Sequence, residues 1–152
     1  MDAAQLTQHI IGMLDGVDVV EANGDTFLMY DPGRDLPPDR RMPFATIVTS
    51  DFNDRASNLD RPGVFRVNIG VTPETYESLL GPPPPGPITA DPIDTGHDYT
   101  QLDTLMPHPI YAPLHWVCIL NPGDASLDRL DALLEEAHAL AAGRRTRHDA
   151  RE

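Results

Sequence analysis

The sequence has very little cysteine and no lysine. Cys118 is the only cysteine among 152 residues, so the chain has no internal disulfide and no CxxC pair to hold zinc or to exchange electrons. All 11 basic residues are arginine, which excludes a lysine nucleophile and a Schiff-base lysine. Disulfide exchange and amine catalysis are therefore not expected.

Long apolar runs are also absent. No segment approaches the roughly 20 apolar residues of a membrane span, and the N-terminus lacks the basic and apolar regions of an export signal. We therefore expect a soluble cytoplasmic protein with no membrane partner. The preference for arginine over lysine, and for aspartate over glutamate, suggests a GC-rich bacterial genome.

Positive charge is scarce and gathers at one end of the chain. The formal net charge is −13, but residues 144–152 hold four arginines against two acids, so this tail carries +2 and residues 1–143 carry −15. An acidic body repels phosphate backbones and lacks the basic stripe that nucleic-acid binding requires. We therefore expect no DNA or RNA partner. The length predicts one domain, residues 1–143, followed by a basic, disordered tail, residues 144–152.

Turn residues and hydrophobic periodicity predict the secondary structure. Asn23-Gly24 is typical of a tight hairpin turn, and Thr72-Pro73-Glu74 combines a capping hydroxyl, a proline and an acid at a helix start. The proline-rich segment 82–100 is expected to form a long loop. The predicted helices are 3–14, 73–80 and 127–142, and the predicted strands are 17–22, 26–30, 44–50, 64–71 and 115–121.

The order of these elements indicates the fold class. Strands and helices do not alternate strictly, as they would in a doubly wound parallel sheet. The sequence therefore predicts an α+β protein, a small, mainly antiparallel sheet with helices packed against it.

Three short strings resemble a known family. RVNIGVTPE at residues 66–74, Pro107-His108, and His115-Trp116-Val117 ahead of a leucine-rich C-terminal helix resemble the MmcQ/YjbR-like family over roughly residues 65–142. The resemblance implies a small antiparallel sheet with packed helices. Members are often labelled DNA-binding, a role that the acidic body argues against.

A closer resemblance spans nearly the whole chain. The strings MPFATIVTSD at residues 42–51 and LDRPGVFR at residues 59–66 resemble a bacterial family of uncharacterised domains. That resemblance implies no activity.

Acidic residues cluster between two predicted strands. Asp51, Asp54, Asp60 and Arg61 lie within eleven residues, so one carboxylate could act as a base while an arginine holds an anionic substrate. Aspartates also cap turns through the nearby backbone, and the structural interpretation is the favoured one.

Arg66 and Asn68 share the polar face of a predicted strand. An arginine in this position is solvated, paired with an acid, or part of a pocket lining. Pairing with one of the 24 acids is the favoured interpretation.

The histidines offer acid/base or metal chemistry. His108 and His115 lie seven residues apart, and with His97, Asp98 and Asp103 they could supply metal ligands. The spacing matches no metal motif, and ring nitrogens bonded to backbone are the favoured interpretation. We therefore predict no metal and no cofactor.

Other catalytic patterns are missing. Cys118 lies in the middle of a predicted strand, where a thiol behaves as a small hydrophobe with a raised pKa. The serines lack a GxSxG context, and the glycines form neither a Walker loop nor a dinucleotide fingerprint.

The favoured function is small-molecule binding in a pocket between the polar strand face and the loops 51–61 and 97–115. Its predicted ligand-binding residues are Arg66, Asn68, Asp60 and Arg61. One alternative is a small acid/base enzyme of lyase, cyclase or hydrolase type that uses His108 or His115 with Asp51 or Asp54. Another is a protein-interaction module that uses the proline run Pro82–Pro85 or the basic tail.

Overall fold

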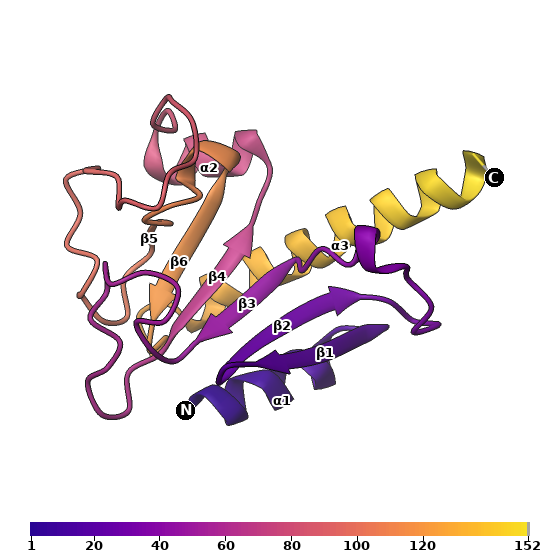
Figure 1. Cartoon of the computed structure of the whole chain (residues 1–152), viewed down its shortest axis with the longest axis horizontal. Helices are drawn as coiled ribbons and strands as arrows, with labels where there is room; N and C mark the ends of the chain where they lie inside the picture. Colours follow the sequence, from indigo (N-terminus) through magenta and orange to yellow (C-terminus); the bar gives the residue numbers. More distant parts are fainter. Residues whose placement is uncertain (152) are drawn as a thin grey trace.

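The computed structural model describes the backbone of residues 1–151 and the side chains of residues 1–147. It contains a six-stranded antiparallel sheet with the strand order β1-β2-β3-β4-β6-β5 (Figure 1). The strands are β1 Val17–Ala22, β2 Asp25–Tyr30, β3 Ala45–Val48, β4 Arg66–Gly70, β5 Met106–Pro107 and β6 Trp116–Leu120. The helices are α1 Ala3–Met13, α2 Pro73–Leu80 and α3 Leu127–Arg151, with short 3-10 turns η1 Pro38–Arg40 and η2 Ala112–Leu114. The predicted α+β class is confirmed.

Local sequence signals account for the N-terminal half. The Asp2 carboxylate accepts a hydrogen bond from the Gln5 backbone N–H, and the Gln5 side chain accepts one from the Asp2 N–H, which completes a capping box for α1. Asn23 and Gly24 both have positive φ, as the predicted hairpin turn between β1 and β2 requires. The hairpin prediction is confirmed.

The two later helices differ in how well the sequence predicts them. The Thr72 hydroxyl accepts from the Thr75 backbone N–H and Pro73 opens the helix, so α2 begins and ends as predicted. α3 does not end at Gly143 as predicted but continues to Arg151. A glycine inside a helix costs only about 1 kcal/mol, and arginine and alanine on either side favour the helix. Within the predicted tail, the side chains of residues 148–151 and the whole of Glu152 lie outside the described residues.

One face of the sheet is covered by helices. α1 and α3 pack on the apolar side chains of β2, β3, β4 and β6, and they enclose the larger core cluster (Figure 1). Its fully buried members include Leu6, Ile47, Val67, Leu130 and Leu134. The inward stripe predicted for the last helix is therefore confirmed. In the described chain, no helix is long and apolar enough to cross a membrane.

The other face of the sheet is covered by loops. Residues 49–65, between β3 and β4, and residues 81–105, between α2 and β5, supply Leu59 and Tyr99 to a second, smaller cluster around Cys118. Arg66 and Asn68 lie on this face and are only 1% and 3% exposed. The face that the sequence marks as polar is thus buried, and its polar groups need partners within the protein.

Candidate functional site

Arg66 is the centre of a buried polar cluster on the loop-covered face. Its Nη2 donates to Asp54 Oδ2 at 2.7 Å and its Nη1 donates to Asp54 Oδ1 at 3.1 Å, so the two side chains form a bidentate ion pair. Nη1 also donates to Ser57 Oγ at 2.9 Å, and Nε donates to Asn68 Oδ1 at 2.9 Å. Every nitrogen of the guanidinium is therefore engaged within the protein.

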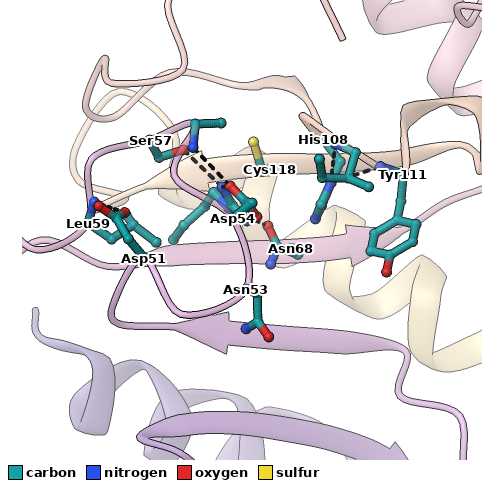
Figure 2. A network of polar contacts seen from close by, with 12 residues as sticks. Asp51, Asn53, Asp54, Ser57, Leu59, Asn68, His108, Tyr111 and Cys118 are labelled. Atoms are coloured by element: carbon teal, nitrogen blue, oxygen red, sulfur yellow. Dashed lines mark hydrogen bonds and ion pairs between the residues drawn. The ribbon is translucent and has the colours of Figure 1, made fainter. Parts of the chain in front are cut away.

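The cluster continues across the sheet through an amide. Asn68 Nδ2 donates to the Thr46 hydroxyl at 3.0 Å on the neighbouring strand β3. Figure 2 shows Asp54 and Ser57, on the loop between β3 and β4, close to Asn68 and Cys118 on the strands beneath it. Strand β4 thus uses its polar side chains to fix this loop, and the predicted pairing of Arg66 with an acid is what the structure contains.

Electrostatics keep Asp54 ionised. Burial raises the pKa of the Asp54 carboxyl, but the hydrogen bonds and the charge of Arg66 outweigh burial and hold this pKa below its usual value. The backbone N–H of Ala56 adds a further hydrogen bond to Asp54 Oδ1. A carboxylate held in this way is a poor proton acceptor near neutral pH.

His108 is buried beside this cluster, and its ring is fixed by backbone. Its Nδ1 accepts hydrogen bonds from the backbone N–H groups of Ile110 and Tyr111, both at 3.0 Å (Figure 2). The proton of the neutral ring is therefore on Nε2. Burial, followed by the nearby charge of Arg66, lowers the pKa of His108 to about 3. Near neutral pH, this ring can donate one hydrogen bond from Nε2 and does not act as a base.

Cys118 lies beside the polar cluster and belongs to the smaller apolar cluster on the same face of the sheet. It is fully buried on β6 opposite Asn68, and burial raises the pKa of its thiol to about 12. The thiol contacts the Pro107 carbonyl at 3.5 Å. The cysteine has the neighbours of a packed apolar residue and not those of a nucleophile.

The remaining acidic-loop residues hold the loop together. Asp51 accepts from the Leu59 backbone N–H at 2.8 Å (Figure 2), and Asp60 accepts from the Asp51 backbone N–H at 3.1 Å. Arg61 donates to the carbonyls of Asn58, Ser57 and Thr100, which ties the two covering loops to each other.

The other histidines do not join His108. His115 has a left-handed backbone conformation and packs edge-on against Tyr76 of α2, with ring centroids 5.8 Å apart. His97 contacts Thr95 in the long loop. Among the described residues, no group of three His, Cys, Asp or Glu side chains could hold a metal ion. The structure therefore brings together Asp54, Arg66, Asn68 and His108, but not His115.

A different region of the molecule contains a hollow that a ligand could enter. A groove of about 410 Å³ lies between the C-terminal half of α3 and residues 31–43, the segment that joins β2 to β3. Figure 1 shows α3 extending past the strands next to this segment. The groove is lined by Tyr30, Leu36, Asp39, Arg40, Met42, Ala141, Arg144, Arg145 and Arg147.

Two walls bring arginines to this groove. Ala141, Arg144 and Arg147 are spaced by three residues and therefore share one side of α3. Arg40 comes from η1 on the opposite wall. Within the described part of the chain, the side chains of Arg40, Arg144 and Arg147 form no ion pair.

Arg145 has a different role in the same groove. Its Nη1 lies 3.4 Å from the buried Asp31 carboxylate and its Nη2 lies 3.0 Å from Asp35. The Asp31 carboxylate also accepts from the backbone N–H groups of Asp35 and Leu36. Arg145 therefore ties the segment 31–43 to α3 and fixes the distance between the two walls.

The sequence contained a signal for this groove. Leu130, Leu134, Ala137 and Ala141 predict the inward stripe of the last helix, and Arg144 follows at the next three-residue step. Gly143 predicts a helix end at this point, which places Arg144 and Arg147 in a disordered tail instead of on the helix. Arg40 had no signal of its own, since it lies in a loop without apolar periodicity.

Fold and sites together define a small α+β domain with an antiparallel sheet, helices on one face and loops on the other. The chain belongs to a family of unknown function, DUF6194, whose model matches residues 1–150. No curated protein and no solved structure matches the chain. Nothing in these comparisons links it to the MmcQ/YjbR-like family.

Proposed function

We propose that this protein binds a small anionic molecule in the groove between α3 and residues 31–43. The observation that carries the proposal is the approach of Arg40, Arg144 and Arg147 from two walls without an ion-pair partner among the described residues. Arginine side chains that face one another repel, and a bound anion relieves this repulsion.

The composition of the chain makes the group of arginines in the groove distinctive. The protein has only 11 basic residues and a net charge of −13, yet four of the basic residues line one groove. Its volume of about 410 Å³ lies within the range of about 300–1,000 Å³ that is typical of ligand sites. An acidic body with one basic groove favours small anions over nucleic acid, whose long backbone would meet the surrounding negative charge.

The buried Arg66 cluster is a weaker candidate for the same function. Arg66 already donates hydrogen bonds to Asp54, Ser57 and Asn68, so a ligand would have to displace one of these side chains. The acid/base alternative meets a similar obstacle, since Nδ1 of His108 already accepts two backbone hydrogen bonds. Asp51 and Asp60 line a hollow of about 520 Å³, but their carboxylates already accept backbone hydrogen bonds. Ligand binding by Asp60 or Arg61, and catalysis by Asp51 or His115, stay predictions.

An NMR titration tests the proposal. Phenyl phosphate and phenyl sulfate, added separately to the ¹⁵N-labelled full chain, should shift amide signals of residues 36–42 and 141–147. Arg144→Gln and Arg147→Gln should weaken the response, whereas Arg129→Gln removes the same charge from an exposed site on the same helix and should leave it unchanged. The absence of shifts with both compounds, or equal shifts in all variants, would contradict the proposal.

A further inference from the structure

We propose that the ligand of the groove carries a dianionic head, such as a phosphate monoester, joined to an apolar body. This inference rests on the proposed function and narrows it to a class of ligand. It follows from the arrangement of charge and apolar surface around Arg40, Arg144 and Arg147.

The charged residues that line the groove indicate how many negative charges the ligand carries. Arg145 is already paired with Asp31 and Asp35, so it contributes no uncompensated positive charge to the groove. The remaining charged lining residues are three arginines and the carboxylate of Asp39, which together leave two positive charges. With its two carboxylates the Arg145 group carries one negative charge, so the ligand charge is set by the three arginines that have no ion-pair partner among the described residues, and a dianion can satisfy these better than a monoanion.

The spacing of the arginines points to a compact head group. Arg144 and Arg147 are one turn apart on α3, close enough that the charge of Arg147 adds to partial burial in lowering the pKa of Arg144. Two guanidiniums on one wall and a third on the other can surround an acceptor group that offers several oxygens. Phosphate provides this arrangement with strong acceptors, and arginine binds it through paired N–H groups.

The rest of the groove is apolar. Tyr30, Leu36 and Ala141 line it together with Met42, which is 69% exposed. The Tyr30 ring is held edge-on by His138 of α3, with centroids 5.1 Å apart, so this part of the floor is fixed. An exposed methionine beside a basic cluster is a flexible apolar contact for a ligand body.

A matched pair of ligands tests the inference. Phenyl phosphate and phenyl sulfate have nearly the same shape, but at pH 8 the phosphate monoester carries about two negative charges and the sulfate ester one. Isothermal titration of the full chain should give at least tenfold tighter binding for phenyl phosphate. Arg40→Gln should reduce the affinity for phenyl phosphate about tenfold and should narrow the difference between the two ligands.

Inorganic phosphate measures the apolar contribution. It should bind at least tenfold more weakly than phenyl phosphate, and Met42→Ser should lower the affinity for phenyl phosphate while leaving that for inorganic phosphate unchanged. Equal affinities for the two phenyl esters would overturn the dianionic head, and equal affinities for the two phosphates would overturn the apolar body. In both cases the proposed function would stand, whereas failure of all three ligands to bind would remove both proposals.

Discussion

Asp54 and Arg66 form an ion pair at 2.7 Å in which both side chains are almost completely buried, with 6% and 2% of their surface exposed. The pair joins the loop 49–65 to strand β4. Removing one partner would leave an unpaired charge in a buried site, which destabilises the fold far more than removing both partners.

Arg66→Ala and Asp54→Ala should each lower the free energy of unfolding by about 3–5 kcal/mol. The double variant should lose much less than the sum of the two, because neither charge is then left alone. Chemical denaturation of the four proteins measures this coupling. The exposed pair Arg41–Asp18, at 3.3 Å, is the matched control and should couple by no more than about 1 kcal/mol. Additive losses at Arg66 and Asp54 would contradict the structural role.

The fold could be predicted from sequence wherever a local pattern determines the structure. Asn23-Gly24 requires a tight turn, Thr72-Pro73 starts a helix, and Leu130 and Leu134 repeat at helical spacing. In each case the physical cause lies within a few residues of the element. Strand β5 has only two residues and no such pattern, so the sequence predicts a loop there.

The candidate site depends on contacts between distant segments, which local patterns do not contain. Arg66 was expected to pair with an acid, but 24 acids were available and only the path of the loop selects Asp54. His115 lies immediately before β6 on a turn with positive φ, and its ring packs against Tyr76 and not against Arg66. The sequence does not predict the groove because Gly143 indicates a helix end eight residues before the last residue of α3, Arg151.

His108 makes stability depend on pH. Its pKa in the folded protein is about 3, whereas an unfolded histidine titrates near about 6.5. Between these values the unfolded chain binds a proton that the folded chain does not, so stability is lost as the pH falls from 6.5 toward 3, by up to about 1.4 kcal/mol per pH unit. Thermal melts across this range should show the slope, and His108→Asn should reduce it. If the slope is unchanged in His108→Asn, the pH dependence of stability comes from titratable groups other than His108.

The ring nitrogen that matters for folding is Nδ1 of His108. Asparagine places its Oδ1 close to this position and can accept the same backbone hydrogen bonds, whereas glutamine places its oxygen one atom further out. His108→Gln should therefore cost about 1–3 kcal/mol for each N–H left without a partner, and His108→Asn should cost less. Denaturant melts at pH 7.5 measure the free energies of unfolding of the two variants. Equal losses in both variants would contradict this role of Nδ1.

Shortening the buried leucines of α3 should destabilise the protein. Leu130→Ala and Leu134→Ala remove fully buried side chains and should each cost about 2–5 kcal/mol. Glu135→Ala, on the exposed side of α3, should change stability by less than about 0.5 kcal/mol. Urea denaturation measures all three, and similar losses at the three positions would mean that the helix is rotated about its axis.

The loop cover of the second sheet face makes Cys118 a reporter of local opening. The thiol is fully buried beneath segments held by carboxylates and arginines, while the helix-covered face carries the larger apolar cluster. A thiol reagent can reach it only when these loops lift, an event that need not unfold the helical side. The rate of Cys118 modification in the native protein therefore separates the opening of the loops from the unfolding of the whole domain.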